Sequence, residues 1–213
     1  MNTDALIARL SERAAPIGPG AAPRILLIGI GGGAAVSAAA MLLWLGLRPD
    51  LVAAMASGMY WMKFSYTLLF AACAFWTVER LSRPGAPSRP QMILEALPFA
   101  AVAALALLRL VLASPQARVP MMMGHSAHVC PWRIAVLSLP ILAGALWSLK
   151  RLAPTRPAAA GAAAGLLAGA AGAFIYAFHC DESAMAFVAV WYSFGILLAG
   201  AAGAAAGRLL LRW

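Results

Sequence analysis

Six long apolar runs dominate the pattern of hydrophobic and polar positions along the chain. They lie near residues 24–46, 60–78, 92–113, 132–149, 158–179 and 185–207. Each is long enough to cross a hydrocarbon layer of about 30 Å as a helix, which takes about 20 residues. None shows the short alternating segments of a membrane β-barrel. The pattern therefore predicts an all-α, polytopic membrane protein with six transmembrane helices.

A more polar segment, residues 1–23, precedes the predicted six-helix bundle at 24–213. We expect an amphipathic helix within it that ends before Pro16, because proline disfavours helix in the residue before it. About three helical turns are marginal in water, so the helix predicts a contact with the inner leaflet or with a protein partner. The residues expected to make this contact are Asp4, Leu6, Ile7 and Leu10.

Composition agrees with a membrane protein, since 63% of the 213 residues are hydrophobic and only 11% are charged. The sixteen basic residues explain the net charge of +9 and are unevenly distributed. Eleven lie in the two terminal segments and alternate loops: Arg9, Arg13, Arg24, Arg80, Arg83, Arg89, Lys150, Arg151, Arg156, Arg208 and Arg212. The other loops hold only Arg48, Arg118 and Arg133. By the positive-inside rule both termini are cytoplasmic, and the basic residues meet anionic lipid, so direct nucleic-acid binding is not needed to explain them.

Only three ionisable side chains fall within the predicted spans: Lys63, Glu95 and Arg109. All lie within about two turns of a helix end, where a long side chain can reach the membrane surface. The middle of the membrane is left aliphatic, which argues against a secondary transporter. No acid/base pair or activated nucleophile is evident on either side, so we do not expect an enzyme.

Small residues recur four apart in the last two spans, at Gly161, Gly165 and Gly169 and again at Gly203 and Gly207. This spacing lets helix backbones approach closely in lipid. Packing within the bundle is the simpler interpretation, and a homodimer is the alternative.

The stretch "MMMGHSAHVC", residues 121–130, gathers soft side chains on the predicted outer side. Its last residue, Cys130, opens the fourth span, and Cys180 closes the fifth at the same side and a similar depth. Pro131 suits the first helical position, so we expect Cys130 to be the N-cap, where the helix dipole favours a thiolate. Cys73, inside the second span, is interpreted as an apolar filler.

Three interpretations of this outer layer remain open. Cys130 and Cys180 can form a disulfide in an oxidising compartment. They can instead bind a soft metal ion (copper, zinc or cadmium) together with His125, His128 and His179. Finally, they can be mere neighbours in a crowded loop. Beyond such an ion, the sequence predicts no cofactor.

Three segments resemble the NrsF-type family of bacterial six-helix inner-membrane anti-sigma factors. They are "HVCPWRIAVLSLP" from residue 128, "FHCDESAMAFVAVWYSFGI" from residue 178 and the N-terminal "TDALIARLSERAAPIGPG". The resemblance implies a protein of the bacterial inner membrane that sequesters an extracytoplasmic-function sigma factor through its N-terminus and inner loops. It further implies release of the sigma factor on oxidative or heavy-metal stress, sensed by Cys130 and Cys180.

Two functions of other classes stay as alternatives. A small metal-handling membrane protein would use the same Met, His and Cys cluster as an entry site, but polar groups do not continue inward from it. A purely structural membrane subunit would make no use of the thiols.

Overall fold

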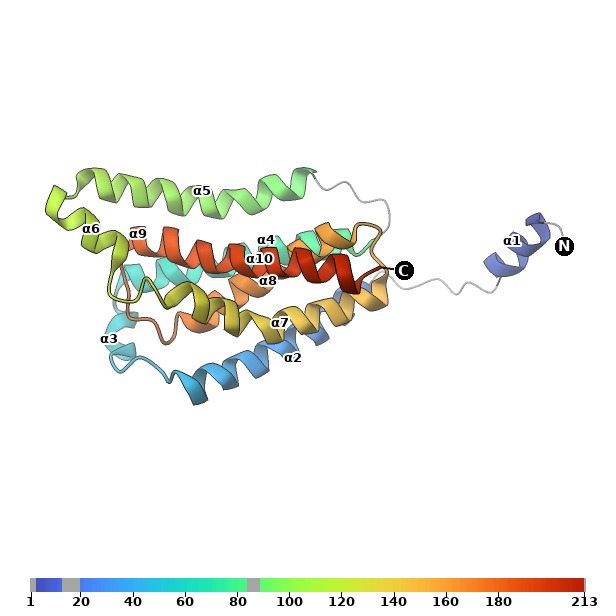
Figure 1. Cartoon of the computed structure of the whole chain (residues 1–213), viewed down its shortest axis with the longest axis horizontal. Helices are drawn as coiled ribbons and strands as arrows, with labels where there is room; N and C mark the ends of the chain where they lie inside the picture. Colours follow the sequence, from blue (N-terminus) through green and yellow to red (C-terminus); the bar gives the residue numbers. More distant parts are fainter. Residues whose placement is uncertain (1–2, 13–19, 84–88, 213) are drawn as a thin grey trace.

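The computed structural model describes residues 3–12, 20–83 and 89–212, which form helices joined by short connections (Figure 1). Its long helices are α2 (Ala21–Trp44), α4 (Gly58–Leu81), α5 (Arg89–Leu112), α7 (Cys130–Leu152), α8 (Pro157–Tyr176) and α10 (Ser193–Leu210). Its short ones are α1 (Thr3–Glu12), α3 (Leu51–Met55), α6 (Pro115–Met123), α9 (Met185–Phe187) and the π-helix η1 (Val188–Tyr192). No strand occurs within these ranges. The predicted all-α fold is confirmed.

Five described helices are long and apolar enough to cross a membrane: Ala21–Trp44, Ile93–Leu112, Cys130–Leu152, Pro157–Tyr176 and Met185–Leu210. They correspond to five of the six predicted spans. The remaining span, 60–78, lies within α4, which is equally long but less apolar because it carries Lys63 and several tyrosine, threonine and tryptophan side chains. Six spans therefore remain a prediction, which depends on α4.

The polar side chains of α4 face other helices. Lys63, Tyr66, Thr67 and Thr77 are all buried, and α4 packs against α8 in the centre of the bundle. The hydroxyl of Tyr66 shares a hydrogen bond of 2.7 Å with that of Ser193 in α10. Burial against protein thus compensates for the low hydropathy of this helix.

The glycines of α8 allow it to pack closely against α10. A Cβ atom at Gly161 would lie 2.3 Å from the carbonyl oxygen of Gly203, and one at Gly165 would lie 2.2 Å from that of Ala199. Such distances are shorter than any van der Waals contact, so only glycine fits. The ridge therefore packs within the bundle, which confirms the simpler interpretation of its spacing.

Helices α2 and α7 meet in the same way on the other side of the bundle. Gly29 and Gly144 face each other so closely that a Cβ at Gly144 would lie 2.0 Å from the carbonyl oxygen of Gly29. Ser37 Oγ donates to the carbonyl of Leu137 at 2.7 Å, and Ser148 Oγ donates to that of Ile25 at 2.9 Å. The two hydroxyls fix the register of the pair.

The two ends of the bundle differ in chemistry. One end, with α3, α6 and α9, holds Cys130 and Cys180, and we call it the thiol end (Figure 1). The opposite end, where α2 begins and α10 ends, carries Arg80, Arg83, Lys150, Arg151, Arg156 and Arg208, and we call it the basic end.

The predicted N-terminal helix is present as α1, whose bounds agree with an end before Pro16. Asp4 is exposed, and Ile7 keeps 59% of its surface exposed. The side chains of Leu6 and Leu10 lie outside the described part of the chain. Helix α2 begins at Ala21, so the boundary of the N-terminal segment lies a few residues before the expected 23.

Candidate functional site

Two cysteines meet in the interior of the thiol end. Cys130 is the first residue of α7, and Cys180 lies in the connection between α8 and α9. Their side chains are 0% and 3% exposed, both are free thiols, and they lie next to each other. The fold thus brings together the two thiols that the sequence placed in one layer.

The expected capping role of Cys130 is wrong. Val129 is the N-cap of α7, and the amide of Cys130 donates to the carbonyl of Ser126 at 2.9 Å. Proline is tolerated throughout the first helical turn, so Pro131 sits one position later than expected. The thiolate is favoured at Cys180 instead. The adjacent Cys130 thiol, as a donor, lowers the pKa of Cys180, burial opposes this effect, and the Lys63 charge lowers the pKa further.

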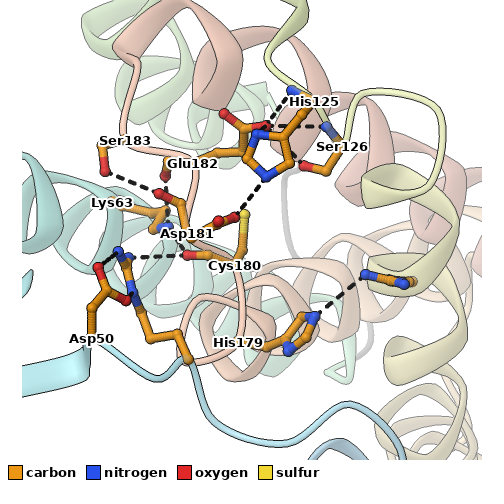
Figure 2. Close-up of polar contacts among 11 residues, drawn as sticks. Asp50, Lys63, His125, Ser126, His179, Cys180, Asp181, Glu182 and Ser183 are labelled. Carbon is orange, nitrogen blue, oxygen red and sulfur yellow. Dashed lines mark hydrogen bonds and ion pairs between the residues drawn. The ribbon is translucent and has the colours of Figure 1, made fainter.

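Two cations hold the loop that carries Cys180 (Figure 2). The Lys63 ammonium donates to the carbonyl oxygens of Cys180 and Glu182 at 2.8 and 2.9 Å. The Arg48 guanidinium donates to the same Cys180 oxygen at 3.3 Å. It also forms a two-pronged ion pair with Asp50, in which both N–O distances are 2.7 Å.

Lys63 does not reach the membrane surface as expected, since it is only 1% exposed. Its ammonium points into the thiol end, where backbone carbonyls replace water as hydrogen-bond acceptors.

The Glu182 side chain joins the Cys180 loop to the connection between α6 and α7. Its Oε1 atom accepts from the amides of His125 and Ser126 at 2.7 and 3.1 Å, and from Ser126 Oγ at 3.1 Å (Figure 2). The backbone at Gly124 has φ +51° and ψ −153°, and a Cβ there would lie 2.3 Å from Oε1. Glycine lets the turn approach the carboxylate.

The three histidines occupy different surroundings. His125 Nε2 lies 3.1 Å from Asp181 Oδ1, and its Nδ1 lies 3.0 Å from Glu182 Oε1. His179 contacts Arg133 through Nε2 at 3.3 Å and the carbonyl of Gly46 through Nδ1 at 3.0 Å. Because arginine only donates, His179 Nε2 must accept and Nδ1 must donate in this arrangement.

An open cavity of about 590 Å³ leads from the surface of the thiol end to Cys180. His125, His128, His179 and Arg133 line it together with Cys180, whereas Cys130 is not among the lining residues. Across the part of the chain that the structure describes, no three His, Cys, Asp or Glu side chains are grouped as metal ligands. The histidines are thus gathered around one cavity, but this geometry gives the expected metal site no support.

The π-helix η1 places Tyr192 against the thiols. This side chain is fully buried, and its hydroxyl lies near the Cys180 sulfur without a well-aligned hydrogen bond to any described residue. π-Helices are uncommon and often occur at functional sites. The sequence analysis missed Tyr192, Arg48 and Glu182 as members of the site; for Lys63 a signal existed, since it is a charge within an apolar run.

Comparison with known proteins agrees with this picture. The model of the family described as "Negative regulator of sigma F" matches residues 10–213. The chain belongs to the NrsF family. It is 42% identical over 215 residues to the anti-sigma-F factor NrsF of Caulobacter vibrioides (strain NA1000 / CB15N). It is 41% identical over 214 residues to the probable anti-sigma-F factor NrsF of Azospira oryzae (strain ATCC BAA-33 / DSM 13638 / PS), and both alignments cover 100% of each chain.

No solved structure matches the chain. Membership of the NrsF family confirms the resemblance seen in the sequence and places the protein among regulators of sigma factors. The family implies a sigma factor as partner, and the apolar helices agree with association with a membrane.

Proposed function

We propose that this protein is an anti-sigma factor of the bacterial inner membrane that crosses it six times with both termini in the cytoplasm. It sequesters an extracytoplasmic-function sigma factor through its N-terminal segment and inner loops, and does not contact nucleic acid itself. An envelope signal acting on Cys130 and Cys180 releases the sigma factor. The observation that carries the sensing step is the buried pair of neighbouring free thiols, of which Cys180 lines an open cavity.

Oxidation of this pair is balanced by a two-electron oxidant from the periplasm. The two thiols lose two protons and two electrons as the S–S bond forms, and hydrogen peroxide, for example, takes them up and is reduced to two molecules of water. Cys180 is reached first, because it lines the cavity and Cys130 does not. A disulfide is favoured over a metal complex because no third ligand is grouped with the thiols among the described side chains.

Bond formation would pull the Cys180 loop toward α7. The same loop is bound by Lys63 of α4 and by Arg48 beyond the end of α2, so α2, α4 and α7 all meet at the reacting residue. A shift of these helices at the thiol end can alter the presentation of the N-terminal segment at the basic end. The signal acts only if the disulfide stabilises the releasing arrangement more than the binding one.

Partner binding is tested by co-purification of the membrane protein with candidate sigma factors. Deletion of residues 1–19, which leaves α2 intact, is expected to abolish recovery of the sigma factor. Leu43→Ala, on the exposed side of α2, is the matched control and is expected to retain it. Full recovery by the truncated protein would relocate binding to the Arg-rich inner loops.

Sensing is tested with a transcription reporter for the released sigma factor. A Cys130→Ser, Cys180→Ser variant is expected to remain silent under hydrogen peroxide and cadmium, whereas Cys73→Ser should respond like the parent. A parental response from the double variant would refute thiol sensing. If the parent protein responds to cadmium but not to peroxide, and the purified protein binds cadmium, the sensing step would be metal binding and not disulfide formation.

A further inference from the structure

Lys63 is an ammonium group deep inside the thiol end whose counter-ion is not a carboxylate. None of the described Asp or Glu side chains lies within 4.0 Å of its nitrogen. Two of its donors go to neutral carbonyl oxygens, and the ring of Tyr192 lies 5.6 Å away. A buried cation of this kind is costly unless a negative charge lies close by.

The carboxylates around the site are bound elsewhere. Asp50 pairs with Arg48, Glu182 binds the turn at His125 and Ser126, and Asp181 lies half-exposed beside His125. The remaining acid beside Lys63 is the thiol pair itself, whose member Cys180 has its carbonyl bound by the ammonium.

We propose that Lys63 is the positioning residue of the thiol pair: its ammonium fixes the Cys180 loop and is the counter-ion of the Cys180 thiolate. This inference rests on the proposed sensing function and identifies which thiol reacts first. The Cys180 thiolate attacks one oxygen of hydrogen peroxide and becomes a sulfenic acid, while the O–O bond breaks and the other oxygen leaves as hydroxide, which takes up a proton to form water. Cys130 then attacks that sulfur, the disulfide forms and the sulfenic oxygen leaves as water.

Charged and titratable groups face Cys180 from every neighbouring element. They are Lys63 of α4, Cys130 of α7, Tyr176 of α8, Tyr192 of η1, Arg48 and Asp50 of the connection after α2, and Asp181 and Glu182 of its own loop. His125, His128, His179 and Arg133 line the cavity that reaches Cys180. Lys63 and Arg48 are the two basic side chains that bind the Cys180 carbonyl oxygen. Arg48 differs from Lys63 because its charge is balanced by Asp50.

This difference supplies a matched control. In a full-length Cys73→Ala, Cys130→Ser protein, Cys180 is the single thiol. Iodoacetamide alkylates this thiol, forming an S–C bond and releasing iodide. Mass spectrometry follows the rate of this alkylation from pH 5.5 to 9.5. Lys63→Gln keeps hydrogen-bond donors but removes the charge. We expect its rate to fall about threefold at pH 6.5, which corresponds to a rise of about one unit from a Cys180 pKa of about 6, and to match the parent at pH 9.5. Lys63→Arg should keep the parental profile, and Arg48→Gln, which removes the other anchor of the same loop, should displace the profile less than Lys63→Gln does.

Two results would overturn the proposal. One is an unchanged profile for Lys63→Gln, and the other is an equal displacement by Arg48→Gln, which would assign the effect to loop anchoring. If Lys63→Gln reacts faster than the parent at pH 9.5, the substitution has opened the Cys180 loop, and the alkylation profile of Lys63→Arg then becomes the deciding measurement. A displaced profile for Lys63→Arg would refute the role of Lys63 as counter-ion of the Cys180 thiolate, and a parental profile would support it.

The outcome is separable from the proposed function. Alkylation reports on Cys180 in the purified protein, whatever its role in cells. If the reporter assay shows no thiol sensing, the effect of Lys63 on Cys180 alkylation is still valid. If Lys63→Gln leaves the alkylation profile unchanged, thiol sensing can still hold, but without a role for Lys63.

Discussion

At the residue scale, the thiol end is assembled by side chains that bind backbone atoms. Glu182 binds amides on the α6–α7 connection, while Lys63 and Arg48 bind carbonyls on the Cys180 loop. Each contact joins segments more than fifty residues apart in the sequence. The thiols are therefore held together by polar contacts from loops and helices that are themselves distant in sequence.

Gly124→Ala is expected to destabilise the protein by about 1–3 kcal/mol. A Cβ would meet the Glu182 carboxylate, and the backbone there has a conformation that essentially only glycine adopts. Thermal unfolding in detergent measures the loss. Gly58→Ala is the control, since nothing lies within 4 Å of a Cβ at that position and its φ is not positive; equal stability of the two variants would contradict the contact.

The Arg48–Asp50 pair predicts a pH dependence. Arg48 holds the pKa of Asp50 below its ordinary value of 3.8 by donating hydrogen bonds to it. A depressed pKa in the folded state means that the stabilisation is present above pH 3.8 and is lost as the pH falls through the lower, folded-state value. Asp50→Asn should therefore unfold at a lower temperature than the parent at pH 7, and the difference should shrink on strong acidification. A difference independent of pH would contradict the ion pair.

At the element scale, α8 shows how composition becomes packing. Its glycines and alanines give little amphipathic pattern, yet most of its length is buried because α4, α7 and α10 surround it. Spacing alone predicted close approach, but it could not choose between a neighbour in the same bundle and a second copy. Contact with Ala199 and Gly203 decided this.

Gly165→Ala is expected to cost about 1–3 kcal/mol of unfolding free energy, because the added methyl group overlaps the α10 backbone and the helices must separate. Gly31→Ala, on α2 where no atom lies within 4 Å of the new Cβ, should be neutral or slightly stabilising. Thermal melts of both variants in one detergent make the comparison, and a similar loss for both would contradict glycine-mediated packing.

At the scale of the whole molecule, α4 determines the topology. Its hydropathy is low, but with α4 counted as a span the start of α2 and the end of α10 lie on one side of the membrane, as in Figure 1. With five spans they would lie on opposite sides. The eleven basic residues agree with six spans, since they then share the cytoplasmic side.

Reporter fusions test this topology. Green fluorescent protein fused after Trp213 is expected to fluoresce, and alkaline phosphatase inserted after Arg118 in α6 is expected to be active. Phosphatase activity at the C-terminus, or inactivity at both positions with full expression, would contradict six spans.

The sequence by itself determined the helical class, five apolar spans, the basic end and the two thiols of interest, because these depend on local hydropathy, charge and chain order. It also predicted a helix before Pro16, the region in which α1 lies. Only the tertiary structure decided that Val129 caps α7, that Lys63 turns inward to the Cys180 carbonyl, and that Glu182 closes the turn at Gly124. The Lys63 and Glu182 contacts join residues far apart in the chain, and the direction of each side chain depends on helix rotation and loop path. Neither can be obtained from a local pattern.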